Sequence, residues 1–456
     1  MFKDSKKQLE ILKLTRETLE SSSIHAIPNI TRNKFYFIKS MWMICFVISA
    51  GFCGYFISKS VSDYLSYEVN TKTQIKYVKK ILFPIVTICD LNPYSSPFAR
   101  KITEKVYNSL PLGLKSYTLS KTQLYLEKMK YEKDLYGYKL DEIIVKCFFS
   151  SRMCNLINEF EFYLDYNYGA CYRFNSGKNF AGRTINKKYV IRNGIWNGLS
   201  LELFIGKSSD NQNLFSQSNG FNIFITSEPL DSNSNEGINI SPGTSTKIIL
   251  TKYSQTKQSK PYSECTDNLI SVDSYDSDCY KKTMSYNRTY HFKTCLDICL
   301  QKYVADNCNC QFTFNLPYDE KLKWCFIDNG DIENITKTSF ENSSCAQNYW
   351  LKFSNIDSIV DQCDCPVECE YTGYDYVAST AQYPTMKYYE LELKNNSVIN
   401  SRLFSNVTFE NVRDSVAKVD IFFNNLQETV ITENIKMNLT DLVSNIGGLL
   451  GLFMGK

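Results

Sequence analysis

The residues of this chain whose types and spacing could support chemistry are its cysteines. Two of the 17, Cys45 and Cys53, lie in an apolar segment, which leaves fifteen further along the chain. The pairs Cys308-x-Cys310 and Cys363-x-Cys365 have spacings that zinc ligands use. Zinc sites often recruit histidine too, and only one of the two histidines lies near the cysteine cluster. Disulfide bonds are therefore the favoured interpretation, and an odd count leaves at least one thiol over or paired between chains.

Catalytic chemistry has little support in the sequence. We find no nucleophile elbow, no zinc-protease motif and no histidine-bearing triad. His25 precedes the apolar segment, so His291 is the one histidine that could act as a base beyond it. A net charge of +3 on 456 residues gives no basis for nucleic-acid binding. We predict that the chain is not an enzyme, holds no metal and binds no nucleic acid.

The apolar segment Ser40–Ser58 has the length of a membrane helix. It is 19 residues without a charge, bounded by Lys39 and Lys59. At about 1.5 Å per residue a helix there spans about 28 Å, close to the thickness of the hydrocarbon core. A cleaved signal peptide would place its apolar region nearer the N-terminus. The first 39 residues hold eight Lys/Arg, so the positive-inside tendency predicts a cytoplasmic N-terminus and an extracellular, oxidising location for the residues after Lys59.

A second apolar segment ends the chain and is rich in glycine. Gly447, Gly451 and Gly455 are spaced by four, so on a helix they share one face that other backbones can approach closely. A short hydrophobic tail is one interpretation of this segment. The other, which we favour, is that it begins a second membrane helix and that the chain is truncated there.

The elements that position these residues are expected to mix strands and helices. Charged, helix-prone segments are 101–108 and 121–146, and Cys295 and Cys299 lie four apart on one helical face. Cys363 and Cys365 are expected on an extended segment that ends at Pro366. β-branched and aromatic runs predict strands at 83–89, 169–175, 200–205, 221–226, 246–251 and 418–423.

Together these motifs resemble those of the degenerin/epithelial sodium channel family, the amiloride-sensitive sodium channels that include acid-sensing and peptide-gated members. The resemblance runs from Ser22 to Gly455. Residues 83–93 (FPIVTICDLNP) resemble the strand after the first membrane helix, 169–175 (GACYRFN) the strand bonded to it, and 419–423 (VDIFF) the last strand before the second helix. The cysteine spacings also match those of the family: Cys147-x6-Cys154, Cys295-x3-Cys299, Cys308-x-Cys310 and Cys363-x-Cys365-x3-Cys369.

The resemblance implies a membrane protein of the α+β class. It has two membrane helices, the second incomplete here, and a disulfide-rich ectodomain with a β-sheet palm and ball and a helical finger and thumb. It also implies assembly in lipid as a homo- or heterotrimer around a pore. The disulfide pairs that it implies are Cys89–Cys171, Cys147–Cys154, Cys265–Cys369, Cys295–Cys365, Cys299–Cys363, Cys308–Cys345 and Cys310–Cys325, which leave Cys279 over.

Gating residues are implied by position. His25 and Ala26 stand where the family has His-Gly, and Ala26 removes the freedom of the glycine. Tyr67 and Tyr262 match an aromatic pair that couples the ectodomain to the membrane helices, although plain core packing explains two tyrosines equally well. Ser444 lies near a position where bulky residues hold degenerin channels open.

Pore residues are implied at the end of the chain. Gly455 and Lys456 match the first two positions of the Gly-x-Ser selectivity filter, and Gly451 matches the position where amiloride acts. A ring of three backbone carbonyls can replace part of the water shell of Na⁺, the permeant ion. A lysine facing the ion path would repel sodium, so Lys456 is expected to point elsewhere. No cofactor is implied.

The ectodomain also carries acceptor sequons for N-glycosylation, which agree with an extracellular location. They begin at Asn287, Asn334, Asn342, Asn395 and Asn406.

We predict a subunit of a sodium-selective, amiloride-sensitive channel of the plasma membrane. Acid-sensing relatives carry carboxylates where this chain has Gln347, Asn424 and 73–75 (TQI), and two histidines leave little to titrate between pH 5 and 8. Gating by protons is therefore disfavoured. Gating by an extracellular peptide, mechanical gating and constitutive opening all remain, and of these we favour peptide gating. A peptide or matrix ligand is the expected extracellular partner. A single-pass type II surface receptor or a non-conducting regulatory subunit is the alternative.

The predicted domains are a cytoplasmic N-terminus with the gating motif (1–39), the first membrane helix (40–58), the extracellular cysteine-rich domain (59–438), and the start of the second membrane helix with the filter (439–456).

Overall fold

The computed structural model divides the chain into two compact units. The helix unit comprises residues 1–72, 257–264 and 432–456, and the sheet unit comprises 73–256 and 265–431. The residues that the structure describes are 11, 13–24, 26–110, 122, 126, 135–165, 167–206, 217–229, 237–267, 269, 271–286, 290–312, 316–325, 337–355, 360–404 and 406–455, without the side chains of 337–340.

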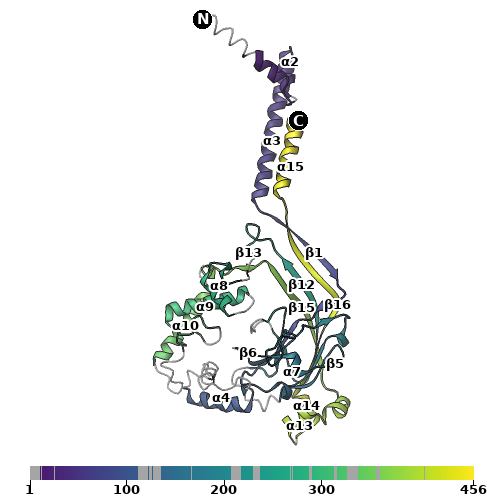
Figure 1. Cartoon of the computed structure of the whole chain (residues 1–456), viewed down its shortest axis with the longest axis vertical. Coiled ribbons are helices and arrows are strands. Elements are labelled where there is room, and N and C mark those ends of the chain that lie inside the picture. Colours follow the sequence, from purple (N-terminus) through teal and green to yellow (C-terminus); the bar gives the residue numbers. More distant parts are fainter. Residues whose placement is uncertain are drawn as a thin grey trace. The chain divides into compact units, whose positions relative to one another are not determined.

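The helix unit is built on one long apolar helix. Helix α2 (Ala26–Arg32) precedes α3 (Tyr36–Leu65), and α15 (Leu439–Leu450) continues into the π-helix η6 (Gly451–Gly455). α3 extends beyond the predicted 40–58 at both ends and includes Lys39, Lys59 and Asp63, because the apolar segment marks the part of the helix that suits lipid and not the ends of the helix itself. Within the described residues it is the one helix long and apolar enough to cross a membrane. The shorter apolar helix formed by α15 and η6 lies beside it (Figure 1).

The sheet unit contains two large sheets. The first has seven strands in the order β15-β12-β16-β9-β4-β5, with β1 also paired to β16, and the second has the order β11-β10-β3-β7-β6. The strands of the first sheet are β1 (Val69–Tyr77), β4 (Ile144–Phe149), β5 (Arg152–Met153), β9 (Leu199–Phe204), β12 (Thr244–Thr256), β15 (Glu370–Gln382) and β16 (Val416–Ile435). Those of the second are β3 (Ile85–Asp90), β6 (Phe160–Asp165), β7 (Gly169–Phe174), β10 (Phe221–Thr226) and β11 (Ile238–Ile240). Strands β1 and β16 begin in one unit and end in the other.

One hydrophobic core joins both large sheets. Ile88 of β3, Phe174 of β7, Leu201 of β9 and Val419 of β16 belong to it, each fully or almost fully buried. Phe83 lies at its centre and contacts the rings of three other phenylalanines edge-on. Because β7 is buried throughout and the first half of β16 is mostly buried, their sequences do not alternate between apolar and polar residues, although Arg173, Lys418 and Asp420 interrupt the apolar residues.

Smaller elements complete the sheet unit. Two short sheets pair β2 (Ile81–Leu82) with β8 (Tyr189–Val190), and β13 (Cys265–Thr266) with β14 (Val367–Glu368). The helices before residue 275 are α4 (Pro97–Ser109), α6 (Leu140–Ile143), α7 (Leu156–Glu159), η3 (Ile195–Asn197) and η4 (Val272–Ser274). Those after it are α8 (Asp278–Ser285), α9 (Phe292–Cys308), α10 (Lys337–Asn355), α12 (Met386–Tyr388), the π-helix η5 (Tyr389–Leu393), α13 (Ser397–Leu403) and α14 (Phe409–Arg413).

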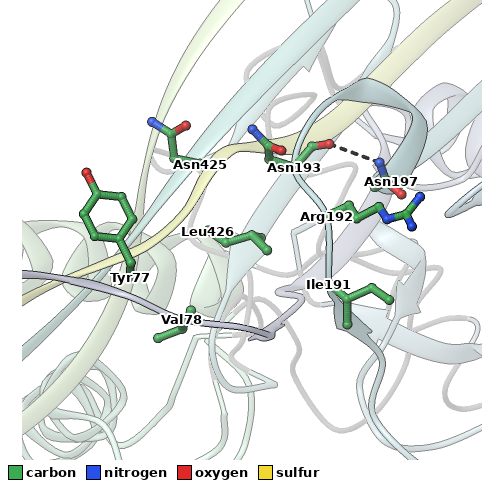
Figure 2. A pocket seen from close by; sticks show the side chains of 8 residues that line it. All are labelled: Tyr77, Val78, Ile191, Arg192, Asn193, Asn197, Asn425 and Leu426. Carbon is green, nitrogen blue, oxygen red and sulfur yellow. Dashed lines mark hydrogen bonds between the residues drawn. The ribbon is translucent and has the colours of Figure 1, made fainter.

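An open cavity of about 470 Å³ lies at the surface of the sheet unit, and Tyr77, Ile191, Arg192, Asn193 and Asn425 of its lining are exposed. Its walls are the end of β1, the middle of β16 and the loop between β8 and β9 (Figure 2).

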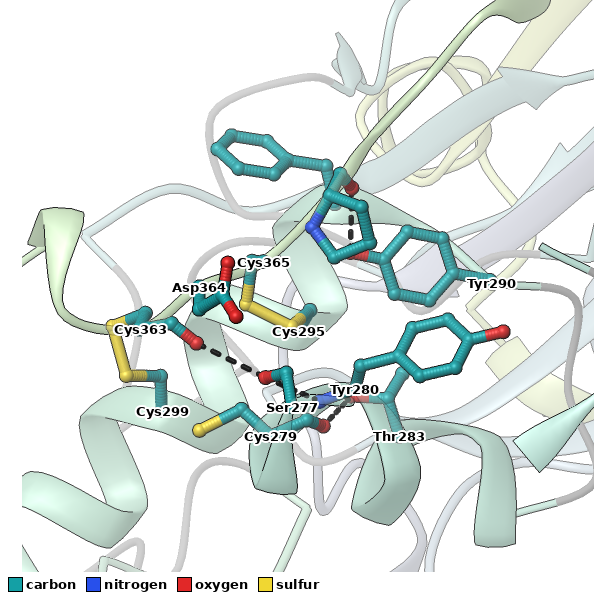
Figure 3. Close-up of a disulfide and its surroundings, with 12 residues drawn as sticks. Ser277, Cys279, Tyr280, Thr283, Tyr290, Cys295, Cys299, Cys363, Asp364 and Cys365 are labelled. Carbon is teal, nitrogen blue, oxygen red and sulfur yellow. Dashed lines mark hydrogen bonds between the residues drawn. A yellow bond between two sulfur atoms is a disulfide. The ribbon is translucent and has the colours of Figure 1, made fainter. Parts of the chain in front are cut away.

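Seven disulfides cross-link the sheet unit, and they are the seven pairs that the resemblance implies. Cys89 and Cys171 lie directly opposite each other on β3 and β7, with their Cα atoms 4.4 Å apart. Cys295–Cys365 and Cys299–Cys363 form successive rungs between α9 and the segment before β14 (Figure 3). The others are Cys147–Cys154, Cys265–Cys369, Cys308–Cys345 and Cys310–Cys325.

Several sequence-based expectations about elements need correction. The strand at 221–226 is confirmed. The helix-prone segment 121–146 ends in strand β4, because Ile144 and Val145 are β-branched and Ile144 and Lys146 pair with β9. Most of that segment lies outside the described residues. Cys363 lies in a turn rather than on an extended segment, because Asp364 adopts a left-handed conformation with φ 46°.

Cys279 is a free thiol buried in the core around α8 and α9. Burial raises its pKa to about 11. At pH 8 we expect iodoacetamide to label Cys279 about a hundredfold more slowly in the native protein than in the unfolded chain, since the thiolate is the reactive form. Peptide mapping by mass spectrometry measures this, with Cys279→Ser as the control. Fast native labelling, or recovery of Cys279 in a disulfide, would contradict its assignment as a buried thiol.

Candidate functional site

The candidate site lies in the helix unit, where the two apolar helices pack together. Cys53 of α3 is 2% exposed, and its Sγ lies 3.9 Å from the carbonyl oxygen of Leu449. The ring of Phe453 stacks on Phe56, with centroids 5.8 Å apart, and on Phe52 at 6.4 Å. Lys436, just before α15, bonds to Glu68, just after α3, whereas Leu449 lies beside Cys53 in the middle of α3. The two helices therefore run antiparallel.

Packing on α3 divides α15 into two faces. Leu442 is the buried residue of α15, and Leu449 lies seven residues, or about two helical turns, further along the same face. At about 100° per residue, Ser444, Gly447 and Gly451 lie roughly opposite these leucines. We call these three residues the Ser/Gly stripe. Ser444 and Gly447 are exposed, and a Cβ added at Gly447 or Gly451 would meet no atom within 4 Å. No described residue of the same chain therefore covers the stripe.

The backbone at the end of this segment is irregular. Gly451–Gly455 forms a single π-helical turn, and Gly455 has φ 72°, which side-chain-bearing residues rarely adopt. π-Turns inside helices occur frequently at functional sites. Lys456, expected to follow Gly455 in the filter, lies outside the described residues, as does His25. Ala26 begins α2 and is half-buried.

The start of α15 is fixed by a capping box. The Asn438 side chain accepts a hydrogen bond from the Asp441 N–H at 2.9 Å, and the Asp441 carboxylate accepts one from the Asn438 N–H at 3.0 Å. Just before it, the Lys436 ammonium donates to the Glu68 carboxylate, and this hydrogen bond raises the pKa of Lys436. The Lys436 N–H also donates to the Glu68 carbonyl at 3.1 Å. The segment before α15 is thus attached to the segment after α3.

Tyr67 and Tyr262 are brought together by the fold. Their rings meet edge-to-face, with centroids 5.4 Å apart and planes at 89°. Tyr67 comes after the end of α3 with φ 50°, a position where glycine is the usual residue. A tyrosine pays about 1 kcal/mol for this left-handed conformation, so its ring is held by surrounding contacts rather than by its own backbone preference.

Glu433 of β16 holds the loop that carries Tyr262. Its carboxylate accepts hydrogen bonds from the Ser263 hydroxyl at 2.7 Å and the Gln258 N–H at 3.1 Å. The Gln258 side-chain amide also donates to the Glu433 carbonyl at 2.8 Å. Sequence reasoning missed Glu433 and the Cys53–Leu449 contact. The partners of Glu433 are about 170 residues away in the sequence, and Leu449 is about 400 residues away from Cys53. Only the folded structure brings these residues together.

In the described part of the sheet unit, Asp90 is the one carboxyl group whose pKa is raised. Burial raises its pKa to about 6, although the Asn92 N–H, Ser95, Arg402 and Arg100 all act in the opposite direction. The expectation that little titrates between pH 5 and 8 rested on the two histidines, and Asp90 is an exception to it.

Three expected glycosylation sites fall within the described residues. Asn395 and Asn406 are exposed, and Asn342 on α10 is half-buried. Asn287 and Asn334 lie outside the described residues. Among the residues that are described, no group of three or more His, Cys, Asp or Glu side chains is placed to hold a metal ion.

A family profile described as amiloride-sensitive sodium channel matches residues 18–456, and the chain belongs to this family of ion channels. It is similar to the degenerin-like protein asic-2 of Caenorhabditis elegans, with 24% identity over 95% of this chain and 82% of that protein. The bile acid-sensitive ion channel of Mus musculus is 22% identical over 97% of this chain and 85% of its own length. The epithelial sodium channel subunit gamma-2 of Xenopus laevis is 26% identical over 71% of this chain, which spans 44% of that protein.

Glu433→Ala is expected to loosen the loop 257–264, because the substitution removes two of the hydrogen bonds that hold Gln258 and Ser263. Trypsin should then cleave after Lys257 several-fold faster in the purified native protein, since local opening exposes the backbone. Lys260 precedes a proline and is not a competing site. The matched control is Asn434→Ala, at the exposed neighbouring position. Equal cleavage rates in the two variants would refute the role of Glu433.

Asp90→Asn is expected to raise thermal stability at pH 7.5. The folded-state pKa of Asp90 lies above the ordinary carboxyl value, so the folded state prefers the protonated form, and stability is lost as pH rises through about 6. The gain should be at most about 3 kcal/mol at pH 7.5 and should shrink toward zero at pH 4. Melting temperatures of both proteins across this range test it. A gain that does not depend on pH would show that the buried charge is not its cause.

Proposed function

We propose that this chain is a pore-forming subunit of a sodium-selective, amiloride-sensitive cation channel of the plasma membrane, with its N-terminus in the cytoplasm. Helix α3 is the first membrane helix, and α15 with η6 begins the second. The observation that carries the proposal is the open Ser/Gly stripe on the face of α15 opposite to α3. Membrane helices approach one another closely where small residues face outward, so this face suits contact with other subunits around a central path.

The residues at the end of this stripe would form the filter. Three copies of the chain would place three backbones near Gly451 and Gly455 around one axis, and their carbonyl oxygens could replace part of the water shell of a sodium ion. The irregular turn at Gly451–Gly455 frees carbonyl groups from regular α-helical bonding, which supports such a role. Lys456 would point away from the ion path. Gly451 would contribute to the amiloride site.

Assembly as a homo- or heterotrimer with related subunits is part of the proposal. The frog relative is by name a subunit of an epithelial sodium channel. Within one chain the stripe has no partner from the described residues, and oligomerisation in lipid would provide one.

Gating is proposed to act through the Tyr67–Tyr262 contact and the Glu433 hydrogen bonds. Strand β1 directly follows α3, and strand β16 directly precedes α15. The contacts of Tyr67 and Glu433 join these strand ends to the loop after β12, which carries Tyr262. A peptide, a matrix ligand or a mechanical force is the proposed stimulus. Asp90 adds a group whose pKa lies near 6, so recordings have to include a pH series.

The test is expression, in oocytes, of the complete reading frame that contains this chain, alone and with related subunits. Ser444→Phe should give a standing inward sodium current, several-fold above that of the unchanged protein, that amiloride blocks. A bulky side chain on the stripe prevents close approach of the helices and so favours the open state. Ser444→Ala keeps the stripe small and is the matched control.

The outcome that counts against the pore assignment is silence after bulky substitutions at Ser444 and at both neighbours, Val443 and Asn445, in protein that reaches the cell surface. In that case a surface receptor or a non-conducting regulatory subunit explains the ectodomain better.

A further inference from the structure

The cavity of about 470 Å³ in the sheet unit is lined by apolar side chains on one hand and by polar or charged side chains on the other. Val78 and Leu426 are half-buried apolar side chains, and the side chain of Ile191 is 68% exposed beside them. The remaining lining residues carry a phenol, a guanidinium or an amide: Tyr77, Arg192, Asn193, Asn197 and Asn425. Figure 2 shows Leu426 between Tyr77 and Arg192, which come from different walls.

Hydrogen bonds fix the walls of this cavity. The Val78 N–H donates to the Leu426 carbonyl at 3.0 Å, which joins β1 to β16. The Asn193 side-chain amide donates to the Asn424 carbonyl at 2.7 Å, and the Asn197 amide donates to the Asn193 carbonyl at 3.0 Å. The loop that carries Arg192 is therefore attached to β16, and the cavity is formed before any ligand enters.

The charge of the cavity has one sign. Arg192 is its one charged lining residue, and Lys79 and Lys80 come directly after Val78 in the chain. Within the described part of the chain the Arg192 guanidinium has no hydrogen-bond or ion-pair partner. The Asn425 amide is exposed and likewise has no partner there. A guanidinium with five N–H donors and no acceptor is suited to a carboxylate, with which it forms two parallel hydrogen bonds.

We propose that this cavity binds a small amphipathic monocarboxylate, with the carboxylate on Arg192 and the apolar body on Val78 and Leu426. The volume is in the range of small-molecule sites. The lining is more polar than that of most such sites, and Val78, Leu426 and Ile191 are its apolar part. A phosphate or other compact polyanion would leave the apolar floor unused and would meet only one guanidinium. An inorganic cation would meet no carboxylate in the lining.

The position of the site also links it to the membrane helices. Its walls include β1, which directly follows α3 in the chain, and β16, which directly precedes α15. Occupancy would bridge the β8–β9 loop and these two strands and stabilise one arrangement of them over another. The binding itself does not depend on whether the chain conducts sodium.

The experiment is titration calorimetry on the full chain, purified in a neutral detergent, with naphthalene-2-carboxylate and its neutral counterpart naphthalene-2-carboxamide. We expect the carboxylate to bind about tenfold or more tightly than the carboxamide, because a charge-assisted hydrogen bond to Arg192 is available only to the former. Arg192→Gln should remove this difference, and Arg192→Lys should retain part of it. Leu426→Ala should weaken both probes alike.

The matched control is Arg183→Gln, which removes an exposed arginine of the same unit outside the cavity and should change nothing. If the unchanged protein binds the carboxylate and the carboxamide with equal affinity, the proposal is overturned. This comparison needs no variant, so it remains valid even if Arg192→Gln fails to fold. Unchanged carboxylate binding in a folded Arg192→Gln protein also overturns it. If neither probe binds and the Arg192 and Leu426 variants instead change the oligomeric state, the proposal is overturned and the surface is an interface between chains.

Discussion

The pairing of the beginning of the chain with its end is the constraint on which the rest of the structure depends. Helix α3 and strand β1 lie within residues 36–77, and their partners β16 and α15 lie within residues 416–450. Backbone hydrogen bonds join them at Lys436–Glu68 and again at Leu426–Val78. Closing a loop of more than 300 residues has a large entropic cost, which the sheets, cores and disulfides between these segments must offset.

Disulfides take over part of the role of an apolar core in the region of α8, α9 and α10. Besides Cys279, the core there includes eight buried or partly buried half-cystines, about as many as its aliphatic side chains or its tyrosines. The two rungs between α9 and the segment before β14 restrict the unfolded chain over separations of 70 and 64 residues. Each such cross-link typically contributes about 2–4 kcal/mol. This region can therefore hold three helices together with less apolar burial than the sheets require.

Local sequence predicted the parts of the fold that are buried on both faces. β10 and the first half of β16 are mostly apolar and mostly buried, and both are predicted as strands. β1, β15 and the second half of β16 are not predicted as strands. Most of their side chains are exposed or half-buried, and their sequences do not alternate between apolar and polar residues. These strands form because a partner strand supplies their hydrogen bonds, which local sequence does not reveal. For the same reason the tyrosine pair could be named from the family pattern, whereas Glu433, which holds one member of it, could not.

The pKa values of the sheet unit also could not be predicted from the types of residue alone. Counting histidines and missing carboxylates leads to the conclusion that protons have little to act on. Asp90 has an ordinary carboxyl group, yet burial at the end of β3 moves its pKa to about 6 in spite of two nearby arginines. Desolvation is the largest of the effects on it, and desolvation is set by the fold rather than by the identity of the residue. In such a chain a buried carboxyl group can therefore respond to acid near pH 6 even when few histidines are present.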